Sequence, residues 1–132
     1  MNDRERIALV RAPNPSAMTL DGTNSYLLFA DDGTAICIDP GPAIDRHVDA
    51  LLARARERDA RIAAIAVTHG HPDHWPAAAS LARATGATVY AHAGAAFPHD
   101  AALRAGDRLA RAGVALVAID APGHTPDHLV FY

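Results

Sequence analysis

Apolar positions along the chain follow two different repeats, one typical of strands and one typical of helices. Short apolar runs bounded by turn residues predict strands at 7–10, 24–30, 34–38, 62–67, 88–91, 114–119 and 129–132. The run 62–67 (IAAIAV) is apolar throughout, which is typical of a strand buried on both faces of a sheet. Asp31, Asp32 and Gly33 separate the second and third runs and predict a hairpin turn there.

Two segments place their apolar residues at helical spacing. The segment 44–58 carries one apolar stripe, made of Ile44, Val48, Leu51, Leu52 and Ala55. Its aspartates come early and its arginines late, which suits the helix dipole. A second helix is predicted to open at Pro76, to run through Leu81 to Thr85, and to stop at Gly86. A hairpin followed by alternating strands and helices predicts a layered α/β sandwich.

Length and composition narrow the class of protein. The 132 residues predict one domain, spanning 1–132, and a hydrophobic fraction of 50% supplies a core. The single cysteine, Cys37, excludes a disulfide scaffold and is expected to be an inert core thiol. No apolar run reaches the roughly 18 residues of a membrane span, and the start lacks a signal-peptide core, so a cytoplasmic protein without a membrane partner is expected. The formal net charge of -3 does not indicate the excess of basic residues that is typical of nucleic-acid-binding proteins.

The histidines gather in one part of the sequence. Seven of the eight lie at or after position 69, and three of them fall in the segment 68–74 (THGHPDH) directly after the apolar run 62–67. Residues two apart in an extended stretch point the same way, so His69 and His71 are expected to face one point. Asp73 and His74 follow the turn at Pro72. Four metal-capable side chains within six residues predict a site for a divalent cation.

A third imidazole for this cation is available further along the chain. The segment 122–128 (PGHTPDH) follows the predicted strand 114–119, and Gly123 allows a sharp bend before His124. Imidazole together with carboxylate favours zinc or iron. A catalytic zinc takes about three protein ligands and keeps one position open, so His69, His71 and His124 are predicted to share one ion.

These two motifs resemble those of a known family. HGHPDH at 69–74 matches the HxHxDH signature of the metallo-β-lactamase fold superfamily, and PGHT at 122–125 is similar to its downstream PGHT element. The stretches 13–27 and 38–41 (IDPG) look like its entry hairpin, closest to the branch of glyoxalase II-like thioesterases and β-lactamase-like-protein-2 type proteins, some of which cut single-stranded RNA. The resemblance implies an αββα sandwich. Because the sequence stops inside the apolar run 129–132, we expect an incomplete domain, the N-terminal half to two-thirds of that fold.

The resemblance also implies roles for individual residues. It gives the ligands of two metals, the first held by His69, His71 and His124 and the second by Asp73 and His74. Asp73 would in addition orient the attacking hydroxide, which makes it the catalytic residue. Asp39 would accept the outer N–H of a ligand imidazole, and His128 is expected behind the ligands or on the substrate side. The implied cofactor is one or two Zn2+ ions, with iron or manganese as alternatives.

Several residues near the motifs stand apart from this scheme. Trp75 and Pro76 replace the small residues that usually follow HxHxDH. His47 is predicted to be an ordinary histidine among the solvated charges of its helix. His92 and His99 are predicted to be ordinary loop histidines.

The function expected from these residues is that of a metal-dependent hydrolase that uses a metal-bound hydroxide on an ester, thioester or similar acyl substrate. A phosphodiester or RNA hydrolase of the same fold, a di-iron redox protein and a non-catalytic metal-binding fragment are the alternatives. A small-molecule substrate is favoured over nucleic acid because the loop 14–21 holds neither an aromatic residue nor an arginine. The later Asp and His of the family have no counterpart before Tyr132, so the 132 residues alone are expected to have little activity.

Overall fold

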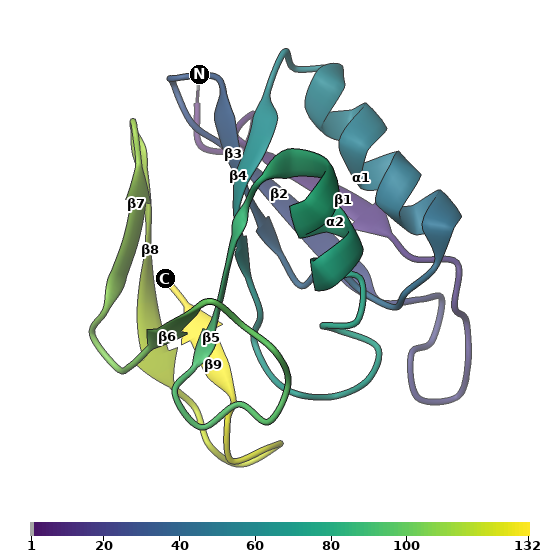
Figure 1. Cartoon of the computed structure of the whole chain (residues 1–132), viewed down its shortest axis with the longest axis vertical. Coiled ribbons are helices and arrows are strands. Elements are labelled where there is room, and N and C mark those ends of the chain that lie inside the picture. The colour runs from purple at the N-terminus through teal and green to yellow at the C-terminus, as the bar shows by residue number, and fades with distance from the viewer. Residues whose placement is uncertain (1) are drawn as a thin grey trace.

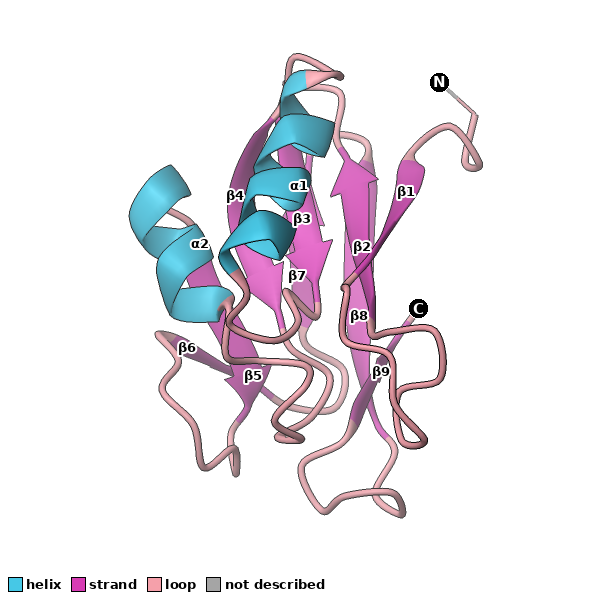
Figure 2. Cartoon of the chain, turned by 90° about the vertical axis from the view of Figure 1, so that its right-hand side faces the viewer, coloured by secondary structure: helices cyan, strands magenta, loops and turns pink. Residues whose placement is uncertain are grey.

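The strands and helices form three layers in the computed structural model of the chain, which describes residues 2–132 (Figures 1 and 2). The elements, in chain order, are β1 (Ile7–Arg11), β2 (Asn24–Phe29), β3 (Thr34–Ile38), α1 (Asp45–Arg56), β4 (Arg61–Ala66), α2 (Ala78–Thr85), β5 (Thr88–His92), β6 (Ala101–Leu103), β7 (Arg108–Arg111), β8 (Val114–Asp120) and β9 (Leu129–Phe131). Helices α1 and α2 cover one face of a large sheet, and a smaller sheet lies on its other side.

The large sheet has six strands in the order β1-β2-β3-β4-β5-β6. Strands β1, β2 and β3 pair antiparallel, and the hairpin around Gly33 joins β2 to β3. From β3 to β6 the pairing is parallel. Helix α1 carries the chain back between β3 and β4, α2 does so between β4 and β5, and a loop connects β5 to β6. The small sheet is antiparallel, in the order β7-β8-β9.

Apolar clusters on both faces of the large sheet hold the layers together. The helix-side core contains Leu51 of α1, Leu81 of α2 and Ile65 of β4, each with 0% of its surface exposed. The core between the sheets is built from Ile36 and Ala64 of the large sheet with Leu109 and Leu116 of the small one. Strand β4 is therefore buried on both faces, as its continuous apolar sequence predicted.

The α/β sandwich predicted from the sequence is confirmed, and each predicted strand and helix ends within two residues of its predicted position. Cys37 is a fully buried free thiol, and burial raises its pKa well above the usual range. Two short strands, β6 and β7, were not predicted. Ala101–Leu103 is too short to show a repeat, and the four residues of Arg108–Arg111 include two arginines.

Long loops gather at one edge of the sandwich, the lower edge in Figure 1. They are the loops that follow β1, β4, β5 and β8. The carboxyl ends of parallel strands β4 and β5 meet there, which is where α/β folds commonly form their sites. Among residues 2–132, no helix is both long enough and apolar enough to cross a membrane.

Candidate metal centre

Three imidazoles from two distant loops converge at this edge. His69 and His71 lie in the loop after β4, and His124 lies in the loop between β8 and β9. One ring nitrogen of each lies within 4.8 Å of those of the other two. The ring centroids are 4.5 to 5.0 Å apart and the ring planes cross at 72° to 80°, so the rings are held edge to face. This spacing lets the three nitrogens reach one cation between them.

His69 is the most buried of the three, with 5% of its surface exposed. Its Nδ1 lies 2.8 Å from the hydroxyl of Thr68, whereas its Nε2 is buried and has no hydrogen-bond partner among residues 2–132. Burial, aided by the neighbouring His74, lowers the pKa of His69 to about 4, and the charge of Asp39 opposes this only in part. A neutral imidazole whose buried nitrogen lacks a partner fits a divalent cation, which would take up that lone pair.

Asp39 connects the end of β3 to the histidine loop. Its Oδ1 accepts the backbone N–H of Thr68 at 2.7 Å, and its Oδ2 accepts the Thr68 hydroxyl at 2.7 Å. The same Oδ2 lies 2.8 Å from Nδ1 of His74. Asp39 is 6% exposed and has a left-handed backbone, with φ of 52°. Such a conformation is costly for a residue other than glycine and is held by these surrounding bonds.

His74 and Asp73 form a second group of ligand atoms next to the first. Nε2 of His74 lies 3.3 Å from Oδ2 of Asp73, and that oxygen also accepts the hydroxyl of Thr23 at 2.7 Å. Burial alone would lower the pKa of His74, but the hydrogen bond and charge of Asp39 outweigh it, so the pKa is raised. Burial alone would raise the pKa of Asp73, but Thr23 and His74 outweigh it, so the pKa is lowered. Asp39, His69 and His74 each offer one ligand atom, and these three atoms also lie within 4.8 Å of one another.

His128 lies beside the same group of rings. Its centroid is 4.5 Å from that of His69 and 5.6 Å from that of His124. Burial, with the charge of His124, lowers its pKa. His128 is thus at the site, next to the imidazoles that could hold a metal.

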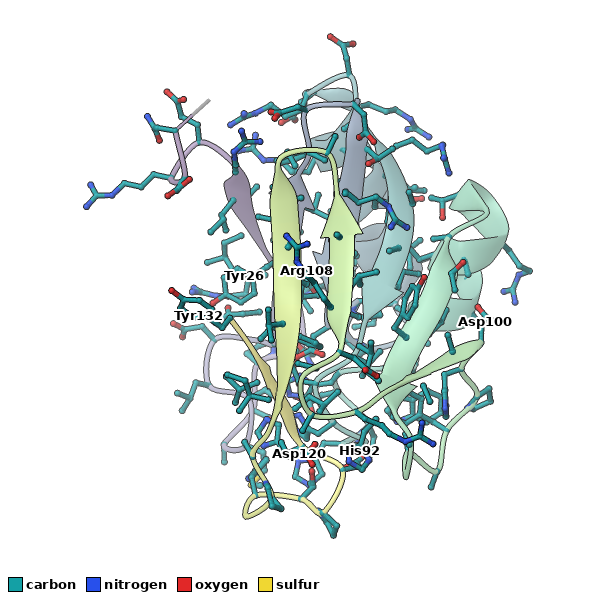
Figure 3. All side chains as sticks on the ribbon, turned by 90° about the vertical axis from the view of Figure 1, so that its left-hand side faces the viewer. Tyr26, His92, Asp100, Arg108, Asp120 and Tyr132 are labelled. Atoms are coloured by element: carbon teal, nitrogen blue, oxygen red, sulfur yellow. The ribbon has the colours of Figure 1, made fainter. Side chains whose placement is uncertain are left out.

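The remaining histidines lie outside this group. His47 was expected to be an ordinary histidine among the solvated charges of its helix, but its ring does not lie with them, because it is 1% exposed and its Nε2 lies 2.9 Å from the Ser25 hydroxyl. It sits against Gly41, where a Cβ would come within 2.9 Å of the ring. His92 lies 3.5 Å from Asp120 at the loop edge (Figure 3), and Nδ1 of His99 bonds the Phe97 carbonyl at 2.8 Å.

Two threonines in the site were not predicted from the sequence. Thr68 bonds both Asp39 and His69, and its place directly before the HxHxDH motif was the available signal. Thr23 bonds Asp73 through its hydroxyl and is 4% exposed. It lies 50 positions from its partner, and no local pattern marks it.

The family model of the metallo-beta-lactamase superfamily matches residues 18–112. The chain belongs to this superfamily. A hydroxyacylglutathione hydrolase of Methylobacillus flagellatus is 39% identical over 113 residues, which cover 83% of this chain and 43% of that protein. The thioesterase pkgB of Emericella nidulans is 34% identical over 119 residues, covering 89% of this chain and 34% of that protein. The expected likeness to the glyoxalase II-like branch is confirmed by these relatives.

Solved structures of the superfamily share the arrangement of elements. The crystal structure of ETHE1 from Myxococcus xanthus superposes with a TM-score of 0.79 at 26% identity, over 96% of this chain and 52% of that one. The chain thus spans less than half the length of the two curated relatives and about half of this structure. The fold of the metallo-beta-lactamase superfamily is confirmed for the part of it that these residues cover.

Proposed function

We propose that the protein is a metal-dependent hydrolase that cleaves thioesters. The observation that carries this proposal is the convergence of His69, His71 and His124, with a buried Nε2 of His69 that lacks a partner in residues 2–132. Three imidazoles form the usual protein share of a catalytic zinc site, in which a further position is kept open. The names of the relatives, a hydroxyacylglutathione hydrolase and a thioesterase, support an acyl-sulfur substrate.

The proposed ligands fall into two sets. His69, His71 and His124 would hold the first ion, and Asp73 with His74 would contribute to a second. Zinc is the cation we propose, because the donor set combines imidazoles with carboxylate. When bound, a divalent cation supplies Lewis-acid polarisation of the scissile carbonyl and acidifies water at neutral pH.

The protein's own residues then hold this site in one geometry. Asp39 accepts from Nδ1 of His74, which leaves Nε2 of that ring free to act as a ligand. Thr68 contacts both Asp39 and His69 through its hydroxyl, which joins the end of β3 to the loop after β4. Asp73 keeps its charge at neutral pH, because its pKa is lowered, and is the residue we assign to hold the proton of the attacking water. His128 stands beside His69, where it would limit the ring's rotation.

A substrate-class comparison tests the proposal. The zinc-loaded whole protein containing these residues is assayed with a thioester, by thiol release, and with bis(p-nitrophenyl) phosphate. We expect the kcat/KM for the thioester to exceed that for the phosphodiester by at least about tenfold, with loss of both after chelation and recovery on zinc addition. A preference for the phosphodiester, or thioester cleavage that survives chelation, would overturn the proposal.

A further inference from the structure

An apolar pocket opens directly beside the histidines. Its volume is about 440 Å3, within the range of small-molecule binding sites. Its walls include His71 together with Trp75, Ala96, Phe97 and Pro126. Among the candidate ligands, all of which lie in residues 2–132, His71 alone lines this pocket. The pocket therefore meets the proposed metal site only at His71.

A rigid aromatic pair forms one wall. The rings of Trp75 and Phe97 are stacked, with centroids 5.1 Å apart and planes 8° from parallel. The indole N–H of Trp75 donates to the carbonyl of Gly70 at 3.2 Å, and Phe97 is 6% exposed. Because the indole nitrogen already has its partner and the ring has a fixed neighbour, the wall is preformed and offers an apolar surface.

One residue that lines the pocket carries a carboxylate. This residue is Asp127, and its Oδ2 lies only 2.9 Å from where a Cβ on Gly70 would stand. An anionic ligand would meet this carboxylate in a partly apolar space, where like charges repel strongly. The pocket thus combines apolar walls with a carboxylate that disfavours an anionic ligand.

We propose that this pocket binds the acyl arm of the substrate and selects uncharged, apolar acyl chains over short hydroxyacyl groups. The inference rests on the proposed thioester cleavage, because a carbonyl held at the three histidines can extend one arm past His71. Thiol carriers are polar and often charged, so the acyl arm is the one that suits these walls. A short hydroxyacyl group would leave most of the volume empty.

Binding without metal tests this selectivity separately from hydrolysis. Trp75 is the only tryptophan in the 132 residues, so its emission reports on the pocket. The protein in EDTA is titrated with N-acetylcysteamine thioesters that differ only in the acyl group: phenylacetyl, hexanoyl or lactoyl. We expect the two apolar probes to shift the emission and to bind at least about tenfold more tightly than the lactoyl probe.

Matched variants locate the binding. Ala96→Asp places a charge at the exposed wall of the pocket and should weaken phenylacetyl binding at least about tenfold. Ala93→Asp, an exposed position in the same loop that does not line the pocket, should leave it unchanged. Equal affinity for all three probes, no binding of the apolar ones, or equal effects of the two variants would overturn the inference. The metal-dependent assay decides the hydrolase proposal on its own, because no metal enters this titration.

Discussion

Nδ1 of His74 lies 2.8 Å from Oδ2 of Asp39, and this contact ties the end of β3 to the turn after β4. The same carboxylate also accepts two bonds from Thr68, one from its backbone and one from its hydroxyl. Asp39 thereby fixes the ring whose other nitrogen faces Asp73, and the backbone that leads into His69.

Asp39→Asn tests this bracing. The amide still fills the space but cannot accept all three bonds with the strength of a carboxylate. We expect zinc affinity to fall by about 10- to 100-fold, measured by competition with a chromogenic chelator. Asp45→Asn, at an exposed position of α1, is the matched control and should leave zinc affinity unchanged. Equal affinities in the two variants would contradict the bracing role.

Thr23→Val tests the bond to Asp73. Valine keeps the shape of this buried side chain and removes the hydroxyl that donates to Oδ2 at 2.7 Å. A less firmly held carboxylate should lower kcat for the thioester by about tenfold, with circular dichroism unchanged. Thr85→Val removes a hydroxyl that bonds only within the helix-end region, to the Leu81 carbonyl and the Ala87 N–H, and serves as the control. An unaltered kcat in Thr23→Val would show that the bond from Thr23 does not help Asp73 in the reaction.

The stability of the metal-free protein should fall in mild acid. The folded pKa of His69 is lowered to about 4, and burial also lowers the pKa values of His47 and His128. These rings stay neutral in the folded state while the unfolded chain takes up protons below about 6.5, so stability is lost as the pH falls from about 6.5 towards 4. The pKa of His74 is raised, so its contribution is already complete below 6.5 and does not change in this window.

Urea unfolding in EDTA at about pH 6 and about pH 5 measures this loss, because both values lie below 6.5, where the contribution of His74 is already complete. His69→Gln removes one of the three titrating rings, and we expect a smaller loss of stability between the two pH values than in the parent protein. His99→Gln, whose ring lies outside the histidine group, should keep the parent loss. A protein equally stable at both values would show that the histidines do not have these lowered pKa values.

His47→Ala should reduce stability without removing the metal. The ring is buried against Gly41, and its loss would leave the buried hydroxyl of Ser25 without this partner. We expect the free energy of unfolding to fall by about 2 kcal/mol, measured by chemical denaturation, with bound zinc retained. His99→Ala should change it by no more than about 0.5 kcal/mol. Loss of zinc from His47→Ala would mean that the ring does more than pack.

The strands and helices were predictable because each is long enough to show its repeat. Strand β4 and helix α1 carry nearly complete apolar patterns, and both lie where the sequence placed them. Strands β6 and β7 were missed because three or four residues show no repeat, and their position depends on partners elsewhere in the chain.

Within the site, the sequence indicated the functional side chains that lie close together along the chain. It did not indicate hydrogen bonds from residues that are distant in sequence. The HxHxDH spacing fixes His69 and His71 locally, whereas the bond from Thr23 to Asp73 joins residues 50 positions apart. The burial of His47 was mispredicted because its neighbours Asp45, Arg46 and Asp49 are charged, although its own position falls on the inward face of α1 beside Val48 and Leu51. In a helix that carries both charged and apolar residues, the local sequence does not indicate which polar residue will face a loop that packs against the helix.

His69, His71 and His124 are proposed to share one cation. Metal content by elemental analysis, after loading with zinc and removal of free ion, tests it in the parent protein, His124→Ala and His99→Ala, each first shown to be folded. We predict bound zinc in the parent and in His99→Ala, and loss of zinc from the first site in His124→Ala. Equal zinc in all three proteins would contradict the account.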